Sequence, residues 1–228
     1  MRIISWNCAM GFAKKRHLVE ALQPDVAILP EVSMKAITES DVPFKSWVGS
    51  NPNKGLGVLG FTDRTYEEFP AGRLLPWHVP FSVDGINIIA LWAHVHTRQL
   101  RYVRVTHEIV DRHAEFLQHQ PSLLIGDFNS NTAWDREHPG QSHSMLVDKL
   151  AGMGLHSVHH RQEDVPHGAE VVKTYFHTKK LHFGHHIDYA FLSEGTQASL
   201  VVGRQEDWLP YSDHMPLILD VERAANRV

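Results

Sequence analysis

Short apolar segments recur along the whole chain, and most of them end in Gly, Pro, Asn or Asp. Segments of this length with turn-forming residues at their ends are typical of β-strands. They span residues 2–7, 25–31, 56–62, 78–83, 86–95, 122–128, 187–193, 198–204 and 215–221. About nine strands exceed what a small doubly wound sheet contains, so the pattern favours two sheets packed face to face.

Helical periodicity appears in three stretches between these segments. Residues 13–22 lie between two predicted strands, which favours a parallel βαβ pairing in a mixed sheet. The longest candidate helix runs from Arg98 to Gln120, and another is predicted from Ser142 to about Ala151. The expected fold is therefore α/β, with two packed mixed β-sheets flanked by helices.

The length and composition fit a single domain better than two. The 228 residues are 43% hydrophobic and contain no repeat or linker, so we expect a single domain over residues 1–228. The single cysteine, Cys8, excludes an internal disulfide. The first residues lack the features of a targeting signal and no apolar run approaches the roughly 18 residues that span a bilayer, so we expect a soluble cytoplasmic protein. A net charge of −4 argues against bulk coating of nucleic acid, but it allows an enzyme that contacts a few phosphates.

Histidine is abundant, with 18 residues, and many of them lie between His156 and His186. The sequence lacks the cysteine pairs that make a zinc motif specific. Most of these side chains are therefore expected to be surface or hydrogen-bonded histidines, and a zinc site is the alternative.

The predicted strand in PSLLIGDFNSN (residues 121–131) ends abruptly in polar residues. Because alternate side chains of a strand share a face, Asp127 and Asn129 should project together while Phe128 points into the core. A buried acid beside an amide is unfavourable unless both are satisfied. Either the two residues cap the following turn, or they belong to a functional site.

Polar residues occupy the ends of other predicted strands as well. Asn7 closes the first strand, Glu31 closes the second, Asp188 interrupts a later one, and the segment 212–214 (SDH) precedes the last. A turn or cap explains each of them alone, but their coincidence favours one shared crevice. Carboxylate and amide oxygens suit a hard cation such as Mg²⁺, which proteins hold with one or two carboxylates, waters and substrate phosphate.

Five blocks of the sequence, in this order, resemble the endonuclease/exonuclease/phosphatase superfamily, which includes DNase I-like nucleases and exonuclease III-type abasic-site endonucleases. The blocks are SWN (5–7), PE (30–31), GDFNS (126–130), IDYAFLS (187–193) and SDHMPL (212–217). GDFN alone is a weak signal, whereas the ordered set, each block at a strand end, is specific. The resemblance covers essentially the whole chain and implies a DNase I-like, four-layer α/β sandwich.

The resemblance implies a metal site at three of the matching positions. Glu31 is expected to be the principal ligand of Mg²⁺, with Mn²⁺ as the alternative ion. Asn7 is expected to lie beside it, and Asp213 to share the site.

The resemblance also implies the catalytic roles. Asp127 matches the residue that orients or deprotonates the attacking water, and Asn129 the amide that holds the phosphate. His214 is expected to contact a phosphate oxygen, with Asp188 bonded to its other ring nitrogen. These residue types can stabilise the charge that develops during phosphodiester hydrolysis and accept the proton of the water.

A further catalytic candidate is His94, which resembles a histidine that DNase I-like members carry on the equivalent strand. His96 lies two positions away and is the weaker candidate. Those enzymes pair the histidine with an acid on an earlier strand, but here the region 51–60 contains Lys54 and no carboxylate.

Two segments are candidates for substrate contact. Arg98 and Arg101 should form a stripe with Arg104 at the start of the long helix, where they meet a phosphate backbone or lie on a solvated face. Tyr175 and His177 belong to a tract of bases and aromatics that leads to Asp188, and either border the cleft or lie on an edge strand.

The leading hypothesis is a Mg²⁺-dependent phosphodiesterase that acts on nucleic acid, as a DNA endonuclease or exonuclease. The alternative within the same fold is a phosphatase or phosphodiesterase for a small phosphorylated metabolite or lipid headgroup, since a fold does not fix a function. A binding module without catalytic activity is a third reading, but such a protein would be expected to have lost one of the acids or the histidine.

Overall fold

Two mixed β-sheets pack face to face between helices in the computed structural model, which describes residues 1–71, 77–119 and 121–222. The predicted fold class, with two packed mixed sheets flanked by helices, is confirmed. Within the described ranges no helix has the length and apolar character that crossing a bilayer requires.

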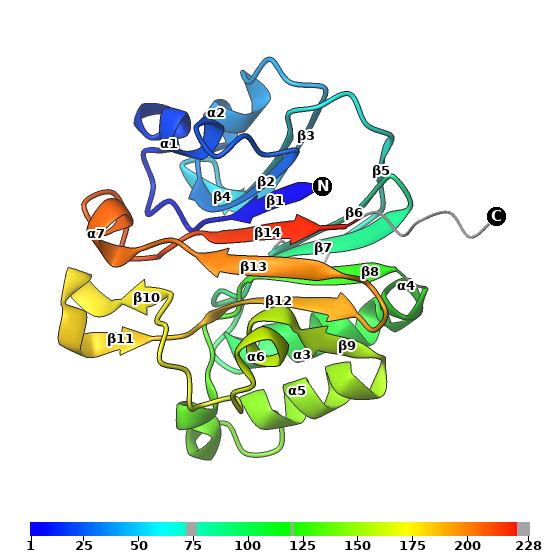
Figure 1. Cartoon of the computed structure of the whole chain (residues 1–228), viewed down its shortest axis with the longest axis vertical. Helices are drawn as coiled ribbons and strands as arrows, with labels where there is room; N and C mark the ends of the chain where they lie inside the picture. The colour runs from blue at the N-terminus through cyan, green and yellow to red at the C-terminus, as the bar shows by residue number, and fades with distance from the viewer. Residues whose placement is uncertain (72–76, 120, 223–228) are drawn as a thin grey trace.

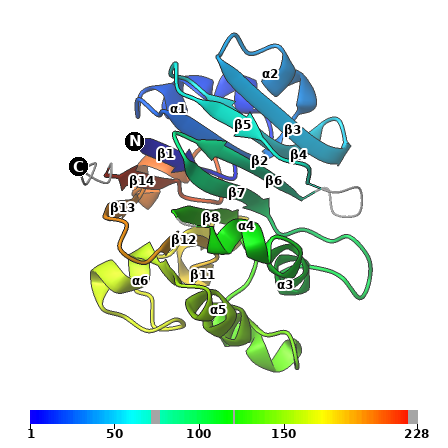
Figure 2. The ribbon, with the colours of Figure 1, turned by 90° about the vertical axis from the view of Figure 1, so that its right-hand side faces the viewer.

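The first sheet has six strands, of which only β1 and β2 form a parallel pair among the described strands. In spatial order the strands are β13 (Ala198–Val202), β14 (Leu217–Val221), β1 (Arg2–Ser5), β2 (Val26–Val32), β4 (Lys54–Gly60) and β3 (Phe44–Asn51). The parallel pair is connected through η1 (Phe12–Lys14) and α1 (Arg16–Glu20), as the βαβ pattern predicts. Helices α1 and α2 (Met34–Thr38) cover the outer face of this sheet (Figure 2).

The second sheet also has six strands, and its parallel pair is β7 with β8. In spatial order the strands are β5 (Tyr66–Glu68), β6 (His78–Val83), β7 (Ile86–Trp92), β8 (Ser122–Asp127), β12 (Asp188–Ser193) and β9 (Leu155–Ser157). Its outer side carries α3 (Val103–Arg112), α4 (Ala114–Gln118), α5 (His143–Gly152) and α6 (Val158–Glu163) (Figure 2).

The remaining elements lie in connections. They are η2 (Thr132–Glu137), β10 (Tyr175–Phe176), η3 (His177–Lys179), η4 (Leu181–Phe183), β11 (Gly184–His185) and α7 (Gln205–Trp208). Strands β10 and β11 pair with each other as a two-stranded hairpin, which projects at the left of the molecule in Figure 1.

Both faces of the central strand β1 are buried. Ile3 packs in the larger core, which includes residues of both sheets, whereas Ile4 packs with Val19 and Ile37 of α1 and α2. A slip of one residue would exchange these two faces, and truncation of a buried isoleucine to alanine costs about 2–5 kcal/mol. Packing on two sides therefore fixes the register of the strand that leads into Asn7.

The sequence pattern does not predict five of the described strands, which are β3, β5, β9, β10 and β11. Three of them, β3, β5 and β9, are edge strands, and the fourth edge strand, β13, is the one that the pattern predicts. Because an edge strand has one solvated side, its hydrophobic alternation is weak and pairing with its neighbour decides its conformation. Strand β3, for example, alternates irregularly between exposed and buried residues.

The predicted helix from Arg98 to Gln120 is wrong at its start, because α3 begins only at Val103. Thr97 and Leu100 close a turn before it, in which the Leu100 N–H donates to Thr97 Oγ1 at 2.9 Å. The next residue but one, Tyr102, has φ 54° and ψ −126°, which is not helical.

Arg98 and Arg101 consequently precede the helix, and they form no helical stripe with Arg104. A break at His113 (φ −109°, ψ 23°) separates α3 from α4. The predicted end of the helix, Gln120, lies outside the described residues.

Gly126, at the end of β8, can be tested as a position where only glycine fits. Its φ is +149°, and a Cβ at this residue would lie 1.9 Å from the carbonyl oxygen of Leu91 on β7. We expect Gly126→Ala to lower the free energy of unfolding by at least about 3 kcal/mol in urea titrations, because the backbone at Leu91 or at residue 126 must move to relieve the clash. Gly85→Ala is the matched control, since Gly85 also has positive φ (+81°) but nothing within 4 Å of the added Cβ. Equal losses in the two variants would contradict the steric explanation.

Candidate active site

The ends of four strands bring the predicted catalytic residues together. Asp127 ends β8 and Asp188 begins β12, and the two are directly opposite each other in an antiparallel pair. Asn7 follows β1, and His214 lies shortly before β14. The site is therefore built across both sheets, from segments that are far apart in the sequence.

Asp127 is the centre of the hydrogen-bond network. Asn7 Nδ2 donates to Asp127 Oδ2 at 3.0 Å, and the Asn129 side-chain amide donates to the same oxygen at 2.9 Å. The Asn129 backbone N–H donates to Asp127 Oδ1 at 2.9 Å. Phe128 is fully buried in the core, as strand alternation predicts. The network satisfies the buried carboxylate and holds both amides against it.

His214 lies between two acids. Its Nδ1 is 3.0 Å from Asp188 Oδ2, and its Nε2 is 4.0 Å from Asp127 Oδ2. The predicted contact of Asp188 with one ring nitrogen of His214 is thus present. The second ring nitrogen faces Asp127 and also lies 3.5 Å from Asn7 Nδ2.

Burial and charge shift the protonation of this group. Burial lowers the pKa of His214, but the carboxylates of Asp188 and Asp127 raise it more, and the net effect is an increase to about 10. Burial raises the pKa of Asp127 to about 7, with His214 opposing the increase and Asp188 adding to it. His214 therefore holds its proton at neutral pH, and Asp127 is a better proton acceptor than a surface aspartate.

Two further residues position the site, and no sequence pattern singles out their roles. The Thr174 hydroxyl accepts the backbone N–H groups of Ile187 and Asp188, both at 3.0 Å, and so fixes the start of β12. The Ser212 hydroxyl donates to Asn7 O at 2.7 Å and accepts the His214 N–H at 3.0 Å. Serine and threonine are too common in loops for such contacts to be recognised before the chain is folded.

Glu31 lies at a bulge in β2. Its φ is 63°, and the pairing with β4 shifts register between Pro30 and Val32. The carboxylate is partly exposed and forms an ion pair of 3.1 Å with Lys54. Bulges commonly redirect a side chain next to active sites, and here the carboxylate is left accessible to a cation.

The three donors predicted for Mg²⁺ come from separate segments of the chain. Asp213 immediately precedes His214 and is half-buried. Burial raises the pKa of Tyr175, and the negative charges of Asp213, Asp127 and Glu31 raise it further. All three carboxylates therefore contribute to the electrostatic potential at the Tyr175 hydroxyl. Asn7 Oδ1 accepts the Ala9 N–H at 3.0 Å and keeps a second lone pair. Two carboxylates and one amide oxygen are donor types that Mg²⁺ uses.

His94 is placed by aromatic rings instead of by an acid. It stacks on Trp92, with ring centroids 4.5 Å apart, and meets Trp77 edge-on. Burial lowers its pKa, Lys54 lowers it further, and Glu31 opposes both. In the described part of the chain no acid forms a hydrogen bond with His94, so the pairing typical of DNase I-like members is not observed here. His96 is exposed.

The candidate substrate contacts divide into two groups. Tyr175 lies beside His214, with ring centroids 4.7 Å apart, and its hydroxyl forms a hydrogen bond of 2.8 Å with His177 Nδ1. The β10–β11 hairpin therefore borders the site. Arg98 and Arg101 are exposed on the loop before α3, and no described hydrogen bond or ion pair joins them to the catalytic residues.

The chain matches one protein family over most of its length. The family described as "Endonuclease/Exonuclease/phosphatase family" matches residues 4–214. No curated protein matches the sequence.

Solved structures share the fold at low sequence identity. A 3′-5′ exonuclease from Neisseria meningitidis gives a TM-score of 0.69 at 17% identity, covering 97% of this chain and 100% of that one. A 3′ phosphatase from Neisseria bound to a product DNA hairpin gives 0.68 at 16% identity, covering 97% and 99%. The endonuclease domain of TRAS1, a telomere-specific non-LTR retrotransposon, gives 0.69 at 16% identity, covering 97% of each chain. The fold is DNase I-like.

The Asp188–His214 contact has a consequence that can be measured by NMR. Because the folded-state pKa of His214 lies above the ordinary value of 6.5, folding retains a proton that the unfolded chain releases. This stabilisation is complete below about pH 6.5 and is lost as the pH rises toward about 10.

We expect Asp188→Asn to move the His214 titration to lower pH, and to make the loss of unfolding free energy between pH 6.5 and pH 10 less steep. Asp63→Asn, at an exposed acid, is the control. An unchanged His214 titration in Asp188→Asn would show that the contact is not electrostatically important.

Proposed function

Because the chain belongs to the endonuclease/exonuclease/phosphatase family, we propose that it is a Mg²⁺-dependent phosphodiesterase that hydrolyses phosphodiester bonds of DNA. Membership of this family makes it a hydrolase of phosphoester bonds. The observation that carries the proposal is the buried group Asp127, Asp188 and His214, whose ligand atoms all lie within 4.8 Å of one another. Its acids and its histidine are all present, which argues against a binding module without activity.

Asp127 is the proposed general base. Its carboxylate is held by Asn7 and Asn129, and burial raises its pKa to about 7, close to the pH at which a base must work. The attacking water donates a proton to this carboxylate and moves toward phosphorus. Asn7 and Asn129 keep the carboxylate oriented while it accepts that proton.

His214 is the proposed stabiliser of phosphate charge. As an imidazolium held by Asp188, it presents an N–H at Nε2 toward the same side of the site as Asp127. Negative charge that develops on phosphate oxygens in the transition state is stabilised by such a fixed donor in a buried site. Asn129 is the second proposed phosphate contact.

The residues proposed to hold Mg²⁺ are Glu31, Asn7 and Asp213. The ion would supply Lewis-acid stabilisation of the phosphate and the leaving oxygen. Binding to Glu31 requires the Lys54 ammonium, 3.1 Å from its carboxylate, to give up part of this ion pair.

DNA is the proposed substrate on two grounds. One structural neighbour is bound to a product DNA hairpin, another is a 3′-5′ exonuclease, and a third is the endonuclease domain of a retrotransposon. The hairpin beside the site presents Tyr175 and His177, whose rings can stack on bases. A small phosphoester is the second candidate substrate, because the net charge of −4 gives the molecule little bulk attraction for a polyanion.

Removal of either central residue should abolish the activity. We expect Asp127→Ala and His214→Ala each to lower the rate by about 10²–10⁴-fold, because each removes a proton acceptor or a charge-stabilising donor. The assay uses supercoiled plasmid, single-stranded DNA, abasic duplex, a 3′-phosphorylated DNA hairpin, RNA and an aryl phosphodiester, each with Mg²⁺ or chelator.

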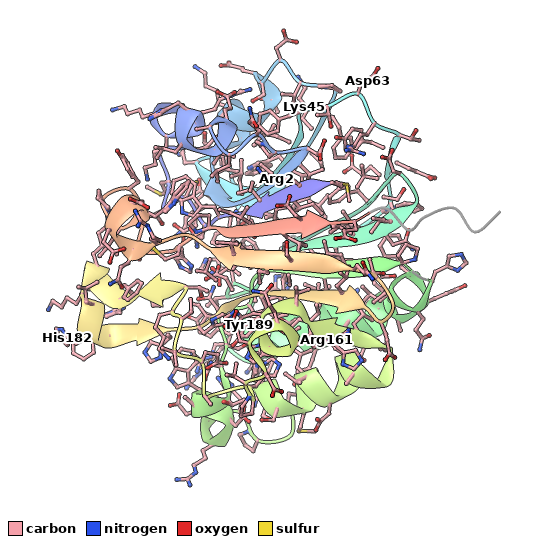
Figure 3. All side chains as sticks on the ribbon, in the orientation of Figure 1. Arg2, Lys45, Asp63, Arg161, His182 and Tyr189 are labelled. Carbon is pink, nitrogen blue, oxygen red and sulfur yellow. The ribbon has the colours of Figure 1, made fainter. Side chains whose placement is uncertain are left out.

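The control for this assay is Asp63→Ala, at an exposed acid between β4 and β5 that is labelled in Figure 3. Chelator-sensitive turnover of DNA that is lost in both central variants supports the proposal. Turnover of only the aryl ester would identify the small-substrate enzyme, and activity that survives both variants would contradict the assigned centre.

The pH dependence should be bell-shaped. Asp127 must be ionised to accept a proton, so kcat/KM should rise as the pH passes through about 7. His214 must be protonated to stabilise phosphate, so kcat/KM should fall again as the pH passes through about 10. Initial rates between pH 5 and pH 11 at saturating Mg²⁺ measure both limbs. A rate that does not change from pH 5 to pH 9 would exclude Asp127 as the base.

A further inference from the structure

Lys54 is the first residue of β4, and its side chain reaches the proposed active site from the first sheet. The Lys54 Nζ lies 5.5 Å from the centroid of the Trp92 ring and 3.1 Å from Glu31 Oε1. Trp92 is directly opposite Asp127 in the parallel pair of β7 and β8, so these two side chains project from the same face of the second sheet. The Lys54 ammonium therefore lies on the face that carries the proposed base.

The backbone of Lys54 is fixed by the turn between β3 and β4, whereas its ammonium is held by a single ion pair. Asn51 and Lys54 form the closing pair of this hairpin, and the Asn53 N–H donates to Asn51 Oδ1 at 3.0 Å. Among the described residues, Glu31 is the one ion-pair partner of the ammonium. Because the ammonium lies at the end of a flexible four-carbon stem, it can change partner while the backbone stays in place.

This ion pair uses the carboxylate that is proposed to hold Mg²⁺. A divalent ion attracts the Glu31 carboxylate more strongly than a single positive charge does, and it repels an ammonium that shares the same carboxylate. The Lys54 and Glu31 side chains are 33% and 21% exposed, so neither charge is enclosed and the core need not open for them to separate. Lys54 therefore loses its partner when the metal site is filled.

Lys15 is held in a different way and provides a contrast. Burial lowers its pKa, whereas the charges of Asp213 and Glu31 oppose this shift, so Lys15 is within electrostatic range of both proposed metal ligands. Its Nζ donates to two backbone carbonyls in the loop after β1, at 2.6 and 3.0 Å. A metal ion at the two carboxylates does not compete for these carbonyls, so Lys15 keeps its contacts. Of these two lysines, only Lys54 is freed for a new contact.

A phosphate oxygen is the acceptor that suits the freed ammonium, because lysine binds phosphate as a compact point charge. His94 stacks on the same Trp92 ring, with centroids 4.5 Å apart, but it does not duplicate this charge. Burial lowers the pKa of His94 and Lys54 lowers it further, so His94 is neutral at neutral pH. Lys54 therefore supplies positive charge at the Trp92 end of the site, whereas His214 supplies it beside Asp188.

We propose that Lys54 binds the substrate phosphate, and that Glu31 holds its ammonium until the metal site is filled. The freed ammonium donates to a non-bridging oxygen of a phosphodiester, in the DNA backbone or in a small ester. The inference rests on the proposed function, because it requires both a metal ion at Glu31 and a phosphoester substrate. It adds that substrate binding depends on metal binding, since Glu31 neutralises the Lys54 charge when the ion is absent.

The first test is a calorimetric Mg²⁺ titration without substrate. We expect Lys54→Met to bind Mg²⁺ at least about twofold more tightly than the wild type, because the variant lacks the cation that competes for Glu31. Lys54→Arg should bind Mg²⁺ like the wild type. Lys45→Met is the matched control, since Lys45 belongs to β3 of the same hairpin but donates to the backbone carbonyls of Thr38 and Ser40 (Figure 3). Weaker or unchanged Mg²⁺ binding in Lys54→Met would contradict the competition, because a lysine that only supports the structure of the site does not oppose the ion.

The second test measures binding of fluorescein-labelled single-stranded DNA at several KCl concentrations, in an Asp127→Asn background that prevents turnover. At one fixed Mg²⁺ concentration, Lys54→Met should reduce the slope of log K against log[salt] by about 0.7, the value for one phosphate contact to a single strand. With chelator in place of Mg²⁺, Lys54→Met should leave the slope unchanged, because Glu31 holds the ammonium. Adding Glu31→Gln should make the effect of Lys54→Met appear in chelator as well.

The outcomes separate this inference from the proposed function. DNA binding with the same salt slope in both lysine forms at fixed Mg²⁺ would overturn the role of Lys54, even where turnover supports the nuclease. If the aryl phosphodiester alone is turned over, its KM should rise about tenfold in Lys54→Met and recover in Lys54→Arg, and an unchanged KM would overturn the inference. Failure of the proposed function is a distinct result, because it is seen as activity that survives Asp127→Ala.

Discussion

The active site depends on the burial of two carboxylates at facing positions of neighbouring strands. Asp127 and Asp188 are paired in register, and they are 0% and 3% exposed. Like charges at such positions repel each other, and the loss of hydration costs several kcal/mol for each ion. A cation must therefore lie between them, and His214 fills that place. Its segment leads into β14 of the other sheet, so the electrostatic requirement couples the two layers of the sandwich.

Much of this arrangement could be predicted because it depends on strand alternation. Asn129 meets Asp127 and Phe128 lies in the core, as a two-residue period predicts, although β8 itself ends at Asp127. Asn7, Asp188 and His214 lie at or near strand ends, as expected. The position of Arg98 could not be predicted in the same way. The turn closed by the hydrogen bond from the Leu100 N–H to Thr97 Oγ1 precedes α3, which begins at Val103. The helical spacing of the residues after this turn does not reveal it. Local patterns fix what repeats along the chain, whereas single hydrogen bonds fix where an element starts.

The bulge in β2 is a second feature that strand alternation does not predict. Leu29 and Val32 both pack on the α1 and α2 side although they are three residues apart, which regular alternation does not allow. Glu31 absorbs the extra residue with φ 63°, an uncommon conformation for a side chain larger than Asn. Asn129 likewise has φ 46°. Strained backbone persists only where the surroundings hold it, and both residues belong to the proposed site, so the strain is consistent with a functional constraint on their orientation.

Strand β12 gives the two sides of the second sheet different chemistry. Asp188 faces a protonated histidine, whereas Tyr189 faces histidines whose lowered pKa leaves them neutral. Neutral buried imidazoles act as polar aromatic rings that stack and share protons in hydrogen bonds, and they add no charge to the field at Asp127. The same residue type therefore serves two purposes within one sheet. The balance between burial and neighbouring acids determines which purpose each histidine serves. Two carboxylates flank His214 and keep it charged, whereas at His143 and His186 burial outweighs the neighbouring carboxylates, which include Glu170.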